Sequence, residues 1–230
     1  MNIQTNIGKT SGRLSLADFY SQAIGICNEL SNIHKRGEWH GRLNIFHIAP
    51  DNESGKHIIQ PPQLPPTAKP AFFHINTQKW DVLELNYLAP EQTGRTENQT
   101  DQRSDIYSLG AIFYELLTGT PPFAHKSPTD VIYHHLAIVP DNICKLRPDI
   151  PTALGMVIGK LLEKNKEERY QSAFGVKEDL WKIQNEKDLN HFKPGMRDWS
   201  GQLIFNKKIY GREKELNSIL NTYQNIQKTR

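Results

Sequence analysis

Three histidines occur close together within residues 40–57, and imidazole nitrogens are common zinc ligands. They are His40, His47 and His57, within a region that we predict to form a β-hairpin. Neither their spacing nor any accompanying Cys or Asp fits a known metal geometry, so we interpret them as ordinary loop histidines. The adjacent His134 and His135 would point to different parts of a helix surface and indicate no site either.

Gly8-Lys9-Thr10 has the ending of a phosphate-binding loop. Such a loop needs another glycine five positions before Gly8, and a strand in front of it. That position is Ile3, and no strand pattern precedes it, so we treat the match as chance. The sequence therefore predicts no cofactor-binding and no metal-binding residue here.

The composition is that of a soluble globular protein, with 37% hydrophobic and 23% charged residues. The net charge of +3, from 28 basic and 25 acidic residues, is too small to favour a nucleic-acid partner. We find no signal peptide and no apolar run near 18 residues, so we expect a cytoplasmic protein with no membrane partner. Cys27 on the apolar face of a predicted helix indicates a buried thiol in a reducing compartment.

Helical spacing of apolar residues dominates the sequence. Ser15 offers an N-cap and Gly37 an end for a helix at about 15–36. Apolar runs at 43–48 and 57–59, with a Gly turn at Ser54-Gly55 between them, predict a β-hairpin. Five prolines in positions 61–70 exclude a helix or a central strand there. We expect further helices from Ser104 to Gly119, over Pro128–Ala137, from Pro151, from Ser172 and at roughly 211–227.

The stretch 87–123 contains an A-P-E tripeptide at Ala89–Glu91 and a D-I-Y-S-L-G run from Asp105. With the order of the predicted elements, it resembles the C-lobe of a eukaryotic-type serine/threonine protein kinase over about residues 15–185. The resemblance implies a mainly α (α+β) fold: a kinase-like C-terminal lobe, helical with one short β-hairpin. Only a flexible N-terminus, residues 1–14, precedes it, so we expect the N-lobe to be absent.

Three further stretches narrow the resemblance. The runs PEQTGR, YSLGAIFYELLTGTPPF and ERYQSAFGVKEDL are similar to large bacterial signalling proteins, in which a kinase domain precedes an ATPase module and often sensor and histidine-kinase domains. KIYGREKELNSIL at 208–220 resembles the first helix of that ATPase module. We therefore expect a linker at 186–207 and the truncated start of an ATPase-type module at 208–230.

The resemblance also implies structural roles for three residues. Glu91 would pair with Arg169 and tie the activation segment to the last helices. Asp105 would sit at its helix N-terminus and accept backbone hydrogen bonds from the catalytic loop, where an acidic residue also suits the helix dipole.

The same resemblance puts unsuitable residues at the positions of kinase chemistry. That chemistry needs an Asp to accept the hydroxyl proton, and an Asn and a second Asp to bind metal. Arg42 stands at the first position, between His40-Gly41 and Leu43, while His47 and Gln60 stand at the other two. Arg cannot accept a proton at neutral pH, and Gln lacks the charge that Mg²⁺ prefers. The run 61–66 could offer a polyproline ligand, but we interpret it as a rigid replacement for the activation-segment start.

Three hypotheses follow from this pattern. The first is a catalytically inactive kinase-like fragment, a pseudokinase, that acts in signalling through protein contacts and needs no cofactor. The alternative is a divergent ATP- and Mg²⁺-dependent serine/threonine kinase that receives its N-lobe from another chain. The third is a link in a sensor–ATPase relay. Each needs a protein partner, such as the missing N-lobe or an adjacent ATPase or sensor module, because the interlobe face would otherwise be exposed.

Overall fold

The computed structural model describes residues 13–50, 57–60, 82–186 and 188–198. The chain divides into two units, Met1–Trp199 and Ser200–Arg230, and all described residues belong to the first. Several sequence predictions lie outside the described residues: the turn at Ser54-Gly55, the proline-rich run, most of the N-terminus 1–14, and the module at 208–230 with its helix at 211–227.

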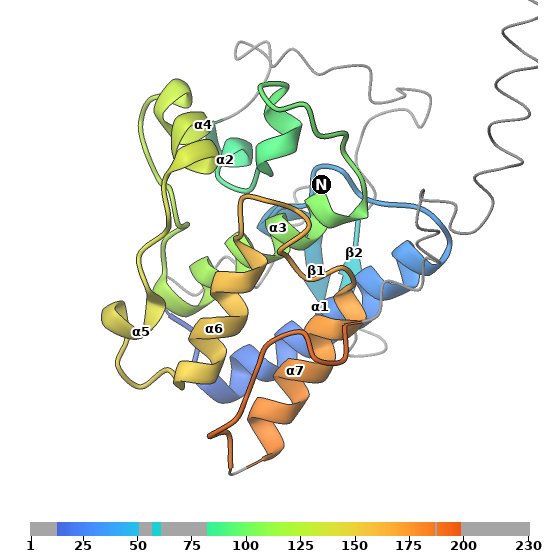
Figure 1. Cartoon of the computed structure of the whole chain (residues 1–230), viewed down its shortest axis with the longest axis vertical. Helices are drawn as coiled ribbons and strands as arrows, with labels where there is room; N and C mark the ends of the chain where they lie inside the picture. Colours follow the sequence, from blue (N-terminus) through green and yellow to red (C-terminus); the bar gives the residue numbers. More distant parts are fainter. Residues whose placement is uncertain (1–12, 51–56, 61–81, 187, 199–230) are drawn as a thin grey trace, which may run out of the picture. The chain divides into compact units, whose positions relative to one another are not determined.

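The described part is mainly helical, with one antiparallel pair of strands, which confirms the predicted fold class (Figure 1). The strands are β1 (Ile48–Pro50) and β2 (His57–Ile59), and Ile48 lies opposite Ile59. The longer helices are α1 (Leu16–Lys35), α3 (Gln102–Thr118), α4 (Pro128–Ala137), α6 (Thr152–Leu161) and α7 (Ala173–Asn185). The shorter ones are α2 (Val82–Leu85), α5 (Ile143–Leu146) and two 3-10 turns, Ile45–His47 and Pro90–Thr93. No described helix has the length and apolar character needed to cross a lipid bilayer.

Serine N-caps fix three of the predicted helix starts. Ser15, Ser127 and Ser172 each accept a hydrogen bond from the backbone N–H three residues on, which satisfies a donor that the first helical turn leaves unpaired. At the far end of α1, Gly37 adopts a φ of 74°, a left-handed conformation that glycine reaches without strain. These boundaries confirm the predictions from local sequence.

Two local predictions were wrong. Helix α3 begins at Gln102 rather than at Ser104 or Asp105, because Asp101 is the N-cap and accepts a hydrogen bond from the Arg103 N–H at 2.8 Å. The run 43–48, predicted as the first strand of the hairpin, is mostly loop and 3-10 turn, and β1 starts only at Ile48. The short helix α5 has no counterpart among the predicted elements.

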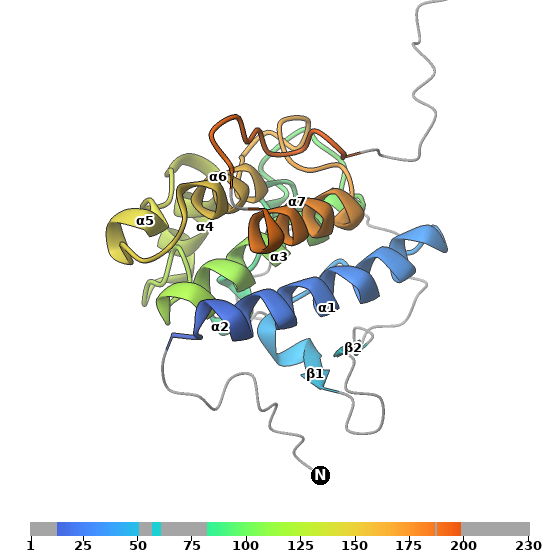
Figure 2. The same cartoon turned by 90° about the horizontal axis from the view of Figure 1, so that it is seen from below.

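The core lies around α3, which packs against α1 and α6, while α7 packs against α1 and α6 (Figure 2). Gly110 on α3 permits the close contact with α6, since a Cβ there would stand 2.7 Å from the Leu161 Cβ. The main core is a continuous cluster of buried side chains, among them Phe19, Ile26, Leu109, Phe113, Leu154 and Leu180, and a small second cluster joins α2 to α4. Burial of these side chains supplies the main stabilisation of the described part.

Part of the predicted linker 186–207 packs on the end of this bundle. Phe192 is buried in the core cluster, and the Gly195 N–H donates to the Asp179 carboxylate at 2.6 Å. The Asp198 carboxylate accepts a hydrogen bond from the Ser172 hydroxyl at 2.7 Å, next to the N-terminus of α7. Residues 188–198 therefore continue the lobe along α7.

A buried ion pair joins the A-P-E region to the chain before α7. The Arg169 guanidinium donates to both carboxylate oxygens of Glu91, at 2.7 and 2.8 Å, and both side chains are at most 1% exposed. Its remaining N–H groups donate to the backbone carbonyls of Arg103, Glu163 and Lys164, so all five donors are used. Burial opposes the charge on Glu91, but the hydrogen bonds and charge of Arg169 outweigh it and hold the pKa of Glu91 below its usual value.

His135 on α4 is fully buried beside this pair. Its Nδ1 lies 2.9 Å from the hydroxyl of Tyr107, whose ring stacks on the Arg169 guanidinium at 4.8 Å. Burial lowers the pKa of His135 to about 3, and the positive charge of Lys164 acts in the same direction. The folded chain therefore keeps His135 neutral at a pH where an unfolded histidine is protonated.

The first prediction concerns the ion pair. Replacing Arg169 with Met should lower the free energy of unfolding by about 3–5 kcal/mol, because the buried Glu91 carboxylate loses its partner. Urea denaturation measures the loss. The control is Arg36→Met, which removes the ion pair between Arg36 and Glu38. Because these two side chains are 56% and 62% exposed, the control should change the free energy of unfolding by less than about 0.5 kcal/mol. A loss below about 1 kcal/mol for Arg169→Met would contradict the structural role of the pair.

The second prediction concerns acid stability. Between pH 6.5 and about 3, the unfolded chain binds a proton at residue 135 that the folded chain does not, so stability falls as the pH falls. This group alone can contribute up to about 1.4 kcal/mol per pH unit. His135→Asn, which keeps a hydrogen-bonding group near Tyr107, should flatten the pH dependence of the unfolding free energy between pH 7 and 4. The exposed His191→Asn serves as control, and equal slopes in all three proteins would refute the prediction.

Candidate functional site

The residues singled out from the sequence meet where the site loop, residues 40–47, crosses the first turn of α3. The Asp105 carboxylate, only 1% exposed, accepts hydrogen bonds from the backbone N–H groups of His40 and Gly41, both at 2.7 Å. His34 at the end of α1 approaches the same carboxylate at 3.0 Å through its Nε2 atom. Gly41 adopts a φ of 73°, which glycine tolerates better than other residues. Asp105 thereby fixes the path of the site loop.

His40 connects the site loop to the end of the hairpin. Its Nδ1 accepts a hydrogen bond from the Arg42 N–H at 3.2 Å, so its Nε2 is the protonated nitrogen and donates to the Gln60 carbonyl at 2.8 Å. The His47 ring lies 4.7 Å from the His40 ring, between centroids. Burial lowers the pKa of both histidines, and that of His47 falls to about 4 with a further contribution from His40. Both rings are therefore neutral at pH 7.

Arg42 faces the A-P-E segment, which we define as residues 82–94. Its Nη2 atom lies 2.9 Å from a carboxylate oxygen of Glu84, and the two side chains are 23% and 31% exposed. Beside this pair, the Gln92 amide donates to the Gly41 carbonyl at 2.5 Å and accepts from the Ala89 N–H at 2.9 Å. Glu84 could not be predicted as the partner of Arg42, since no sequence motif covers that position.

The donor set of this site does not fit magnesium and ATP. Mg²⁺ takes oxygen ligands, chiefly carboxylates, phosphates and water. The three positions in question hold a guanidinium already paired with Glu84, a neutral imidazole at His47 and the uncharged Gln60. No group of three His, Cys, Asp or Glu side chains among the described residues is arranged to hold a metal ion, and the His57 side chain lies outside them.

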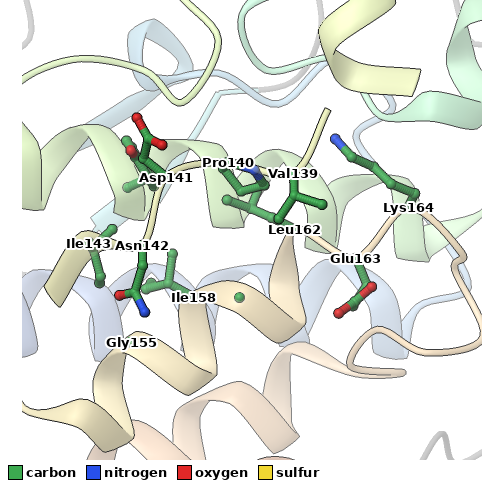
Figure 3. Close-up of a pocket in the computed structure, with 12 residues that line it drawn as sticks. Val139, Pro140, Asp141, Asn142, Ile143, Gly155, Ile158, Leu162, Glu163 and Lys164 are labelled. Atoms are coloured by element: carbon green, nitrogen blue, oxygen red, sulfur yellow. The ribbon is translucent and has the colours of Figure 1, made fainter. Parts of the chain in front are cut away.

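A cavity of about 240 Å³ lies away from the site loop, below the connection between α4 and α5 (Figure 3). Val139, Ile158 and Leu162 form apolar walls, and Gly159 on α6 leaves open space where a Cβ would stand. Lys164 borders this cavity, but its ammonium donates to the His134 carbonyl and the Tyr107 hydroxyl, both at 3.2 Å. Burial and the nearby Arg169 charge lower the pKa of Lys164 to about 7. Sequence reasoning did not single out this cavity, because its walls come from three separate elements.

Comparison with known proteins agrees with the fold described above. Residues 73–181 match the family described as the protein kinase domain. The fold is similar to the kinase domain of PknI from Mycobacterium tuberculosis, with a TM-score of 0.55 at 18% identity, covering 76% of this chain and 58% of that one. At that identity the likeness concerns the fold alone.

Relatives by sequence are kinases of two kinds. Hybrid signal transduction histidine kinase G of Dictyostelium discoideum is 36% identical over 62% of this chain, and the peroxide stress-activated histidine kinase mak3 of Schizosaccharomyces pombe is 26% identical over 91% of it. Serine/threonine-protein kinase PknB of Mycolicibacterium smegmatis is 43% identical over 42% of the chain. The matched regions span only 5%, 9% and 15% of these three relatives. Over the matched residues this chain is thus similar to protein kinases, and its described part has the fold of a helical kinase-like lobe.

Proposed function

We propose that this kinase-like lobe transfers no phosphate and acts in signalling through contacts with other proteins. The observation that carries the proposal is the ion pair between Arg42 and Glu84, because the resemblance to kinases puts Arg42 at the position of the catalytic aspartate. A general base must accept a proton within hydrogen-bond reach of the substrate hydroxyl. A guanidinium cannot do so at neutral pH.

The space beside Arg42 supports the same proposal. Arg42, Glu84 and Gln92 line a cavity of about 10 Å³, which is about the space that one water molecule needs. That volume leaves no room for a phosphate group between Arg42 and Glu84. Glu84 is also a poor substitute for the base, because its carboxylate is paired with the Arg42 guanidinium at 2.9 Å.

The proposed alternative is a divergent, ATP-dependent serine/threonine kinase that phosphorylates protein hydroxyls with an N-lobe supplied by another chain. Exposed apolar side chains near the site loop and β2 favour it, since they offer a surface for a partner. Trp39, Phe46 and Ile58 are 43%, 51% and 45% exposed. The same surface would serve a sensor–ATPase relay, in which the partner is an adjacent ATPase or sensor module. The free, fully buried thiol of Cys27 is consistent with the cytoplasmic location that we propose for all of these.

The third prediction tests nucleotide binding. Thermal unfolding of the chain should show no saturable stabilisation by ATP–Mg²⁺ up to millimolar concentration, because the positions for metal ligands hold no carboxylate. A ligand that binds only the folded state at 100 times its Kd would stabilise the fold by about 2.7 kcal/mol, which such an assay detects readily. The PknB kinase domain serves as positive control. A saturable rise of the melting temperature would overturn the proposed lack of nucleotide binding.

The fourth prediction separates the two functional hypotheses. Transfer of labelled phosphate from ATP to a generic protein substrate should be absent for the chain alone, and also after addition of a polypeptide that supplies the glycine-rich loop and the strand lysine. The matched variant combines Arg42→Asp, His47→Asn and Gln60→Asp, which supplies the missing base and metal ligands. Activity of the variant but not of the natural chain would locate the defect at these three positions, whereas activity of the natural chain with the added lobe would support the kinase alternative.

A further inference from the structure

The A-P-E segment is held against the site loop by two neighbouring contacts. The Arg42–Glu84 ion pair, 2.9 Å between Nη2 and Oε2, joins the loop to α2. Eight residues further on, the Gln92 side chain donates to the Gly41 carbonyl and receives the Ala89 N–H. The segment is thus attached to the loop at two points, one ionic and one between neutral groups.

The Arg42–Glu84 ion pair is buried enough to contribute to local stability. Exposed pairs contribute little, because water screens them and the side chains lose entropy. Arg42 and Glu84 are less exposed than one third, and the adjoining cavity has room for about one water molecule. The contact also bridges residues 42 positions apart in the sequence, so it restrains a long-range arrangement rather than a local turn.

Activation segments of kinases are commonly ordered by phosphorylation, through new pairs between Arg side chains and the phosphate. In this chain, the arginine of the site loop already has a carboxylate partner from the segment itself. Glu84 carries a fixed negative charge, which a phosphate would otherwise supply. The order of the segment therefore needs no modification step.

We propose that the Arg42–Glu84 pair, together with Gln92, is a permanent latch that holds the A-P-E segment against the site loop without phosphorylation. This inference concerns the conformation of the segment and does not depend on whether the lobe transfers phosphate. It gives a role to the arginine at the position of the catalytic base.

Amide hydrogen exchange over residues 84–93 tests the latch, because this stretch contains the N–H groups of Tyr87, Leu88 and Gln92, which donate to backbone carbonyls within the segment. Arg42→Met and Glu84→Gln should each accelerate exchange there by about fivefold or more. The charge-swapped double variant, Arg42→Glu with Glu84→Arg, should bring the rate back to within about twofold of the natural chain. Phosphatase treatment of the natural chain should leave the rate unchanged.

The matched control is the double variant Arg36→Met with Glu38→Gln, which removes an exposed ion pair of similar length, 3.0 Å, from the end of α1. It should leave exchange at 84–93 unchanged. A change below twofold in both single variants would overturn the latch, and so would faster exchange after phosphatase treatment. Equal acceleration in α7 would also overturn it, because it would indicate global unfolding. A swapped variant that exchanges no more slowly than the single variants would do the same. The swapped variant keeps the test decisive even if one single variant fails to fold.

Discussion

The bidentate pair between Glu91 and Arg169 is the interaction on which the rest of the described structure depends. It joins the 3-10 turn at Pro90–Thr93 to the chain before α7, and through the Arg103 carbonyl and the Ser104 hydroxyl it also reaches the first turn of α3. Two buried charges are tolerable only when each satisfies the other and the remaining donors find partners. Arg169 meets this condition with all five N–H groups, so the pair holds the three elements in their observed arrangement.

Asp105 provides the second fixed point, because its carboxylate sets the path of the site loop through backbone contacts. The carboxylate receives two backbone N–H groups from the loop, and neither bond involves the side chains that would handle a nucleotide. A loop held by its backbone can carry different side chains at the same positions. This explains how the geometry of a kinase-like loop coexists with Arg42, His47 and Gln60.

Local sequence signals predicted the helices well, because Ser N-caps and glycine ends act over three or four residues. The partnership of Glu91 with Arg169 came from a family resemblance, since no local pattern joins residues 78 positions apart. What the sequence did not reveal was non-local in the same sense: the pairing of Glu84 with Arg42, and the contact of Asp198 with Ser172. Such contacts depend on how elements pack, and neither composition nor periodicity contains that information.

A charged residue that replaces another in a site is stable there only if the surrounding residues supply a partner for its charge. An arginine that merely replaced an aspartate would have no negatively charged partner. Partial burial of such an unpaired cation costs free energy. The Arg42 guanidinium instead lies 2.9 Å from the Glu84 carboxylate, beside a cavity of only about 10 Å³. Gln92 of the same segment adds a hydrogen bond to the Gly41 carbonyl. The Arg42 position thus has a structural function in the described part of the chain. Under the proposed function, such a lobe would present a fixed surface to a partner, and its specificity would come from the exposed side chains around the site loop, such as Trp39 and Phe46.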